Sequence, residues 1–172
     1  MKERKADLFD TIYEDGVDAI CITTNGHYTK TGGAVMGGGC AGICSRRWPE
    51  TSQRLGKMLK TLGQNIPFVI GCLDADGKYL EPTRAMIKNK EFKVVILSYP
   101  TINQLIDGAN LQLIKQSAAM VKDYADQFDL KGIVIGRPGV GIGGLKWADV
   151  KPELEKILDD RFTIVSFDHE EP

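Results

Sequence analysis

Five short runs of consecutive apolar residues recur along the chain, and each has the length of a β-strand. They occupy residues 17–24, 67–73, 93–100, 131–136 and 162–167. Because the runs are rich in β-branched residues and carry few polar positions, they are typical of strands that are covered on both faces. An N-terminal segment, residues 6–16, has a pattern that fits a strand or a helix equally well.

Between these runs, apolar residues recur with the period of an α-helix. Residues 40–63 form an amphipathic segment in which Pro49 is expected to bend the helix or to split it in two. Two further helices are predicted over residues 110–128 and 146–160. The first has one apolar stripe, formed by Leu111, Ile114, Ala118, Val121 and Ala125, and the second has another, formed by Val150, Leu154, Ile157 and Leu158. The Asp-Gly pair within residues 74–82 predicts a turn or a short hairpin.

This alternation of buried strands and helices predicts the fold class. It favours an α/β fold, a three-layer α/β/α sandwich around a mixed or mostly parallel sheet. The chain has 172 residues, which is enough for one domain with a sizeable core. Since we see no repeat, low-complexity tract or linker, we expect residues 1–172 to form a single domain.

Composition and charge narrow the range of functions. The net charge of −1 gives no broad basic field for nucleic acid, although a local basic patch remains compatible with it. No apolar run approaches the roughly 18 residues of a membrane span, and residues 1–10 lack the apolar core of a signal peptide. We therefore expect a cytoplasmic protein.

The cysteines point to a reduced protein without a metal. None of the four lies in a C-x-x-C pair or near histidines at ligand spacing: Cys21, Cys40, Cys44 and Cys72. Cys40 and Cys44 are interpreted as small packing residues of a helix face, with a redox or metal role as the alternative. We expect no metal and no cofactor.

Two glycine-rich segments each lie between a predicted strand and a predicted helix. They are GGAVMGGGCAG, residues 32–42, and GRPGVGIGGLKW, residues 136–147. Ligands of open α/β sheets bind beyond the carboxyl ends of the strands, so both segments are expected at one edge as two walls of one site. Such loops point backbone N–H groups at an anion, and a helix N-terminus adds partial positive charge. The pair predicts a diphosphate site; tight turns without a ligand are the alternative.

Other nucleotide motifs fit less well. The first loop has no lysine after its glycines and therefore lacks the P-loop motif of nucleotidases. Gly37, Gly39 and Gly42 satisfy G-x-G-x-x-G, which keeps an NAD(P)-dependent Rossmann enzyme open, with Asp74 or Asp76 reading the ribose. That interpretation leaves the second loop unexplained.

Four segments, in the right order, resemble the macrodomain family. VDAICITTNG is similar to the family's second-strand motif, which ends in an asparagine, here Asn25. GGAVMGGGCAGICSRRWP resembles the first phosphate loop of the V-M-G-x-G branch found in bacterial and phage members. RPGVGIGGLKWADVKPELEKIL resembles the second phosphate loop and its helix, and KADLFDT resembles the opening strand. The resemblance extends from about residue 5 to residue 167.

The resemblance implies a site for ADP-ribose or a derivative. Asp7 would accept a hydrogen bond from the adenine amino group, and Asn25 would contact the distal ribose. The two loops would approach the diphosphate from opposite sides, with Gly37, Gly38, Gly39 and Cys40 on one side and Gly139, Val140, Gly141, Ile142 and Gly143 on the other.

The resemblance leaves both hydrolysis and binding without catalysis open. Family members include ADP-ribose readers, enzymes that remove ADP-ribose from proteins or nucleic acids, and phosphatases of ADP-ribose 1″-phosphate. Some use a lysine after the strand that corresponds to VVILSYPT, and others use an acidic residue in the second loop. Those positions are Thr101 or Ile102, and Gly143, in this chain. We expect metal-independent hydrolysis by water at the distal ribose or its 1″-phosphate, and a non-catalytic reader or sequestering protein is the alternative.

Several residues have two interpretations. Asn25 and His27 are the candidate catalytic residues, although His27 also fits an exposed loop histidine. Tyr99 either lines the pocket or packs in the core, Arg137 meets phosphate or the strand end, and Trp147 holds its helix to the sheet or stacks on ligand. Phe167 or Asp168 would border the adenine.

The expected partners follow from the same resemblance. They are ADP-ribose or ADP-ribose 1″-phosphate, with an ADP-ribosylated protein or nucleic acid as further candidates. A monomer is the default expectation.

Overall fold

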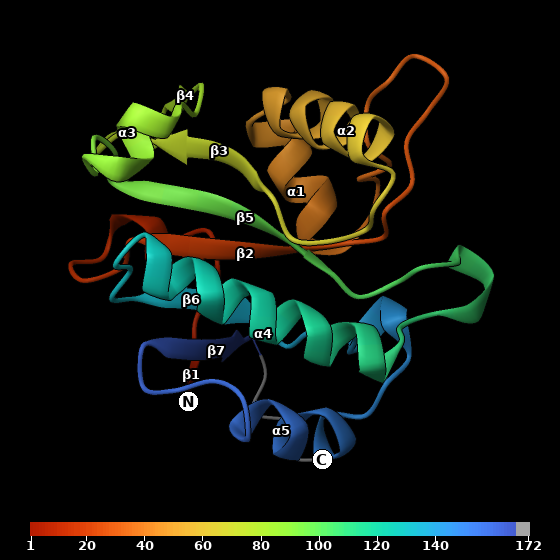
Figure 1. Cartoon of the computed structure of the whole chain (residues 1–172). Coiled ribbons are helices and arrows are strands. Elements are labelled where there is room, and N and C mark those ends of the chain that lie inside the picture. Colours follow the sequence, from red (N-terminus) through yellow and green to blue (C-terminus); the bar gives the residue numbers. More distant parts are fainter. Residues whose placement is uncertain (168–172) are drawn as a thin grey trace.

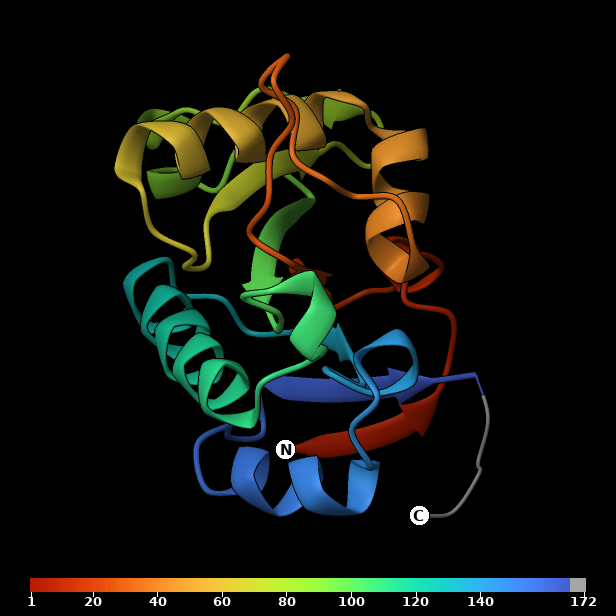
Figure 2. The same ribbon diagram turned by 90° about the vertical axis from the view of Figure 1, so that its right-hand side faces the viewer.

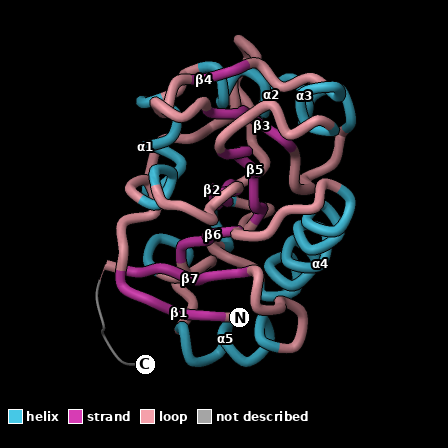
Figure 3. The backbone as a smooth tube through the Cα atoms, turned by 90° about the vertical axis from the view of Figure 1, so that its left-hand side faces the viewer, coloured by secondary structure: helices cyan, strands magenta, loops and turns pink. Residues whose placement is uncertain are grey.

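A seven-stranded sheet forms the centre of the computed structural model, which describes residues 1–167 (Figure 1). The strands are β1 (Lys2–Lys5), β2 (Ala19–Thr24), β3 (Val69–Leu73), β4 (Tyr79–Leu80), β5 (Val94–Pro100), β6 (Ile133–Gly136) and β7 (Phe162–Ser166). Figure 3 shows their order from β4 at the top to β1 at the bottom, which is β4-β3-β5-β2-β6-β7-β1. From β5 to β1 all neighbours pair in parallel, whereas β3 runs antiparallel to both β5 and β4. The predicted mixed sheet is confirmed.

Helices cover both faces of the sheet. One core lies under α1 (Gly39–Arg47) and α2 (Glu50–Leu62), and a second lies under α3 (Arg84–Lys88), α4 (Leu111–Gln127) and α5 (Trp147–Glu155). The side chains of β2 alternate between them, because Ile20 and Ile22 face the first core while Ala19 and Cys21 face the second. Both faces of the strand are therefore buried, and the three-layer sandwich is confirmed. Among residues 1–167, no helix combines the length and the apolar character of a membrane span.

Most predicted elements form where the pattern indicates. All five apolar runs contain a strand, and the Asp-Gly hairpin joins β3 to β4. Pro49 splits the amphipathic segment, because α1 ends at Arg47 and α2 begins at Glu50. The stripe of α4 is buried from Ile114 to Ala125, while Leu111 is only partly buried.

The N-terminal segment is the main correction. The opening strand is Lys2–Lys5, so it ends before most of the KADLFDT motif. The Asp7 carboxylate accepts a hydrogen bond from Phe9 N–H at 2.8 Å and thereby starts a turn. The turn continues into a short 3₁₀ helix, η1 (Thr11–Tyr13). Residues 6–16 are therefore neither the strand nor the α-helix that their pattern allows.

Asp18 fastens the start of β2 to the start of β6. Its two carboxylate oxygens accept the N–H groups of Lys131 (2.9 Å) and Gly132 (3.0 Å). The approach is close, since a Cβ at Gly132 would lie 1.8 Å from the carbonyl oxygen of Gly16. The aspartate of the VDAICITTNG segment therefore has a structural role.

Replacing Asp18 tests this role. We expect Asp18→Ala to lower the free energy of unfolding by about 2 kcal/mol, because two charge-assisted hydrogen bonds are lost. Asp18→Asn, which keeps one acceptor, is expected to lose about half as much. Urea unfolding followed by circular dichroism measures both values, and an Asp18→Ala variant as stable as the parent protein would contradict the assignment.

Candidate functional site

The two glycine-rich loops leave neighbouring parallel strands at the same edge of the sheet, the edge that faces the viewer in Figure 2. The first loop follows β2, which ends at Thr24, and the second follows β6, which ends at Gly136. The loops also meet in space. A Cβ added at Gly38 would lie 3.1 Å from Cδ1 of Ile142, a second-loop side chain that is 78% exposed. The two segments therefore share one edge, as expected from their positions in the sequence.

The backbone conformation at Gly37 and Gly38 does not require glycine. Gly38 lies in extended backbone (φ −124°, ψ 164°), and Gly37 has no positive φ. A Cβ at Gly37 would meet nothing within 4 Å, and at Gly38 it would meet only the flexible end of Ile142. The fold tolerates side chains here, so the open space in front of these residues is available to a ligand.

Helix α1 begins at this open space. Gly38 is its N-cap, and Gly42 N–H is the first to donate along the helix, to Gly38 O at 3.0 Å. The N–H groups of Gly39, Cys40 and Ala41 have no carbonyl one turn earlier in the helix. Donors and helix dipole together favour an anion in front of them. The Cys40 thiol itself is 3.1 Å from the Thr23 hydroxyl, so its backbone N–H is the group left for a ligand.

The second loop is a short 3₁₀ helix, η3 (Gly141–Gly143), with Val140 at its N-cap. Its far end is held in place, because Gly143 O accepts the N–H of Ala109 at 2.9 Å. Gly139 is different from the exposed glycines: it is buried, and a Cβ there would lie 2.5 Å from Ile114. Packing explains why a glycine is required at 139, and its expected contact with a ligand stays a prediction.

Asn25 and His27 follow β2, the central strand of the sheet, and a third segment joins them at this edge. Asn25 Oδ1 accepts His27 N–H at 3.0 Å, and His27 Nε2 lies 3.0 Å from the carbonyl oxygen of Asn103. Because a carbonyl oxygen only accepts, Nε2 carries the proton, and Nδ1 is the nitrogen free to accept one. Among residues 1–167, Nδ2 of Asn25 has no partner.

Asn65 and Asn103 belong to this arrangement and are not identified by the sequence analysis. Nδ2 of Asn65 donates to Ile102 O (3.0 Å) and to Asn103 Oδ1 (3.2 Å). The same side chain packs on Gly26, where a Cβ would lie 2.4 Å from Cγ of Asn65. Asn65 thus holds the His27 loop against the segment after β5. No signal in the sequence links these distant loop residues.

Asp7 lies at the outer end of the same edge, beyond the terminal strand β1. It follows β1, which is three strands away from β2 in the order β1-β7-β6-β2. Three inter-strand steps span roughly 14 Å at the usual strand spacing. Phe167 follows the intervening β7 and is exposed, whereas Asp168 lies outside the described residues. Polar groups therefore flank the two loops. We call the part of the sheet edge that runs from Asp7 past the two loops to Asn25 the strip.

Tyr99 does not line this strip. Its side chain is completely buried in the core under α4, and its hydroxyl donates to Ile114 O at 2.8 Å. Burial raises the pKa of Tyr99, which keeps the hydroxyl protonated as that donor. The expected ligand contact of Tyr99 is wrong, because its strand turns this side chain inward and satisfies its polar atom inside the protein.

Trp147 and Arg137 also have structural partners. Trp147 is buried, and its indole N–H donates to Glu3 at 2.8 Å, which ties α5 to β1. The Arg137 guanidinium lies 5.2 Å from the centre of the Trp147 ring. Trp147 therefore holds its helix to the sheet, as the first interpretation of this residue predicts.

The cysteines offer little chemistry. Cys21, Cys44 and Cys72 are buried, and burial raises the pKa of the Cys44 thiol to about 12. Among residues 1–167, no group of three or more His, Cys, Asp or Glu residues is arranged to hold a metal ion.

The Rossmann interpretation is wrong. Asp74 follows β3, which is antiparallel to β5, so it lies at the sheet edge away from the glycine loops. Its carboxylate accepts the N–H groups of Asp76 (2.9 Å) and Lys78 (3.0 Å) within the hairpin turn. A dinucleotide site needs its ribose-reading acid on the same edge as the loop.

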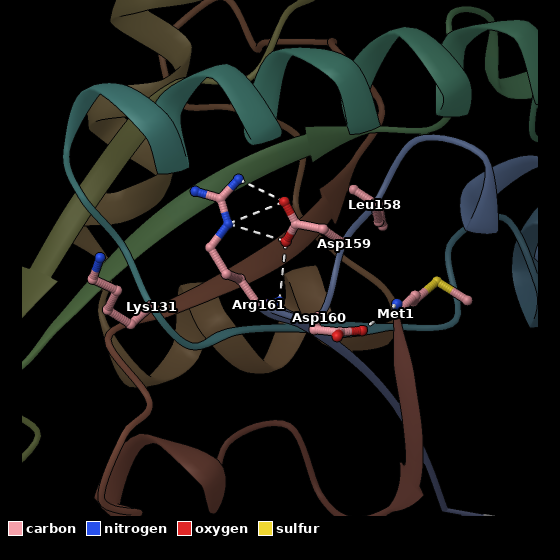
Figure 4. Close-up of a pocket in the computed structure, with 6 residues that line it drawn as sticks. All are labelled: Met1, Lys131, Leu158, Asp159, Asp160 and Arg161. Carbon is pink, nitrogen blue, oxygen red and sulfur yellow. Dashed lines mark hydrogen bonds and ion pairs between the residues drawn. The ribbon is translucent and has the colours of Figure 1, made fainter.

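A hollow of about 530 Å³ lies away from the loops, beside the chain's N-terminus (Figure 4). Its Arg161 is bound by Asp159, with Nη2 to Oδ2 at 2.8 Å, and by Asp126 at 2.8 Å. Hydrogen bonding to Arg161 lowers the pKa of Asp159 to about 2. These charges already neutralise one another, so we assign no site there and take the exposed glycine loops as the candidate.

Comparison with known structures identifies the fold. The macrodomain of Thermus aquaticus DarG matches with a TM-score of 0.69 and 21% identity, over 99% of this chain and 97% of that chain. The macrodomain of Mycobacterium tuberculosis DarG matches with a TM-score of 0.66 and 22% identity, over 95% of each chain. Thermosipho africanus DarTG in complex with ADP-ribose matches with a TM-score of 0.69 and 16% identity, over 94% of this chain.

These matches show that the chain has the macrodomain fold, as the four sequence segments predict. The chain spans 41% of the length of the Thermosipho DarTG chain. No family model matches the sequence, and a search of curated proteins finds no significant match.

The correction at Tyr99 is testable. We expect Tyr99→Phe to lower the free energy of unfolding by about 1 kcal/mol, because one buried hydrogen bond is lost. We expect it to leave the affinity for ADP-ribose unchanged. Urea unfolding and calorimetric titration measure the two quantities. Parental stability combined with weakened binding would return Tyr99 to the pocket.

Proposed function

We propose that this chain, as a single macrodomain, binds ADP-ribose or a derivative along the strip between Asp7 and Asn25. The diphosphate lies between the two glycine loops, with the adenine towards Asp7 and the distal ribose towards Asn25. The observation that carries the proposal is the open space in front of Gly37 and Gly38 at the N-terminus of α1. Phosphate oxygens need backbone donors at close range, and a Cβ there would obstruct them.

The length and polarity of the strip support an elongated ligand. Asp7 offers a carboxylate at one end, and Nδ2 of Asn25 is a donor at the other. The central loops supply backbone N–H groups and no carboxylate. A ligand with a hydrogen-bond donor at one end, a diphosphate in the middle and a hydrogen-bond acceptor at the other end complements these groups in the same order. That a structural neighbour was solved with ADP-ribose agrees with this choice.

We propose further that the chain hydrolyses its ligand at the distal ribose. Nδ1 of His27 takes a proton from water, and the water oxygen attacks C1″, or the phosphorus of a 1″-phosphate, as the bond to the leaving group breaks. The Asn103 carbonyl and the Asn25 amide hold the histidine in place. Asn25 donates to a ribose hydroxyl through Nδ2. No metal takes part in this scheme.

A non-catalytic reader is the second candidate. The positions where relatives carry a catalytic lysine or acid are Thr101 or Ile102, and Gly143. Thr101 is buried, and its N–H donates to Thr24 O at 3.0 Å. Ile102 is apolar and its carbonyl accepts from Asn65. In this second candidate function, the site binds the ligand and keeps it intact.

Binding is tested by filling the open space. We expect Gly38→Val to weaken ADP-ribose binding by at least about tenfold, because the new side chain occupies the place of the phosphate oxygens. The extended backbone of Gly38 accepts valine, so folding is retained. Gly33→Ala is the matched control: it lies in the same loop, and its Cβ would make only an ordinary contact, 3.9 Å from Ser52. Equal calorimetric affinities for the parent and Gly38→Val would refute the site.

Turnover separates the enzyme from the reader. With ADP-ribose 1″-phosphate or an ADP-ribosylated peptide, we expect release of phosphate or ADP-ribose that falls about a hundredfold in His27→Gln. Glutamine keeps a donor for the Asn103 carbonyl but cannot accept the proton. Affinity for ADP-ribose, measured in parallel, is expected to stay at the parental value. Tight binding without any release from either substrate supports the reader.

A further inference from the structure

A second hollow, of about 880 Å³, lies between α2, the β4–α3 connection and the C-terminal end of α4. We call it the cationic hollow. In Figure 1, α3 lies at the left of the molecule and the glycine loops at the right. The hollow is therefore separate from the proposed ADP-ribose site, which needs none of its residues.

The charge of the cationic hollow is strongly one-sided. Four basic side chains line it, namely Arg54, Arg84, Lys88 and Lys90, against one acidic side chain, Asp129. This excess stands out in a chain whose net charge is −1. An anion entering the hollow meets attraction from most of its rim.

Only some of these charges are neutralised inside the protein. Arg54 pairs with Glu81 at 2.7 Å, and Lys90 pairs with Asp129 at 3.3 Å. Hydrogen bonds from Lys131 and Lys90 lower the pKa of Asp129. This carboxylate therefore stays ionised and paired with the two lysines. Among residues 1–167, Arg84 and Lys88 have no ion-pair or hydrogen-bond partner, and both are exposed. They are the two cations available to a ligand.

Part of the wall of the cationic hollow is apolar. Ile87 is buried in the core yet lines the hollow, and Val69 and Pro82 extend its surface. Phe128 completes the wall and is held by stacking on Tyr124, with ring centres 5.5 Å apart and planes at 8°. A simple anion gains nothing from such a wall, whereas a ligand with a flat apolar body gains contact with it.

We propose that the cationic hollow binds a nucleotide unit, with its phosphate at Arg84 and Lys88 and its base against Ile87 and Phe128. The combination of unpaired cations and an apolar, aromatic wall matches a phosphate joined to a planar ring. The unit is supplied either by a free mononucleotide or by single-stranded nucleic acid. The chemistry at the hollow is the same for both.

The experiment follows the backbone amide signals of Ile87 and Phe128 by NMR in the full chain. The probes are cytidine monophosphate, a mixed-sequence single-stranded DNA decamer and inorganic phosphate. We expect the two nucleotide probes to shift both signals saturably, with an affinity that falls as salt rises from about 50 to 200 mM. Stronger binding of the decamer assigns the site to single strands, and equal binding per nucleotide assigns it to free nucleotides.

Variants test whether nucleotide binding takes place at the cationic hollow. The double change Arg84→Ala and Lys88→Ala is expected to weaken nucleotide binding about tenfold or more. The double change Lys57→Ala and Lys60→Ala removes the same charge from exposed positions of α2 outside the lining, and it is expected to leave binding unchanged. Gly38→Val is also expected to leave it unchanged, which separates this site from the glycine loops.

Three results would overturn the proposal. They are the absence of saturable shifts at Ile87 and Phe128, shifts that survive the Arg84 and Lys88 double change, and inorganic phosphate binding as tightly as cytidine monophosphate. The last result would leave only a generic anion site. Thermal unfolding of both double variants checks that their folds are intact, which is expected because all four side chains are exposed.

Discussion

Parallel pairing of β2 with β6 is the constraint on which the rest of the structure depends. It gives two strands that are distant in the sequence a common direction and therefore a common carboxyl edge. Asp18 secures the pairing where the strands begin, and the glycine loops diverge where they end. An antiparallel arrangement would send the loops to opposite edges, as it does for Asp74 after β3. The position of the candidate site thus follows from strand direction alone, without any contribution from side chains.

The glycines divide into those that the fold requires and those that it does not. Gly56 belongs to the first group, since a Cβ there would lie 1.9 Å from Gly32 O and would push α2 off the first loop. Gly132 and Gly139 are also required by close packing. Gly37 and Gly38 belong to the second group, and they leave open space at the start of α1. Counting glycines in the sequence cannot separate the groups, because the separation depends on what lies opposite each residue.

Much of the fold and part of the site could be predicted from the sequence. Buried strands have apolar runs, and the helix period together with Pro49 indicates α1 and α2, so local pattern suffices for these elements. The N-terminal segment could not be assigned, because a hydrogen bond from Phe9 N–H to the Asp7 carboxylate decides its turn. The two interpretations of Tyr99 could not be separated for a related reason: a strand end by itself does not tell which face the ring occupies. Asn65 and Asn103 lie in separate loops whose contact depends on the finished tertiary structure, and the predicted ligand contacts of the loops stay predictions.

The hydrogen bond from Ala109 to Gly143 has a consequence for communication along the strip. Residues 102–109 form one continuous segment, which holds His27 through Asn103 at one end and the second glycine loop through Ala109 at the other. A displacement of η3 therefore pulls on the same segment that orients the imidazole. The two ends of the candidate site therefore share one mechanical support, which gives them a physical route for coupling. The connection between β5 and α4 thus links the His27 loop mechanically to the second glycine loop.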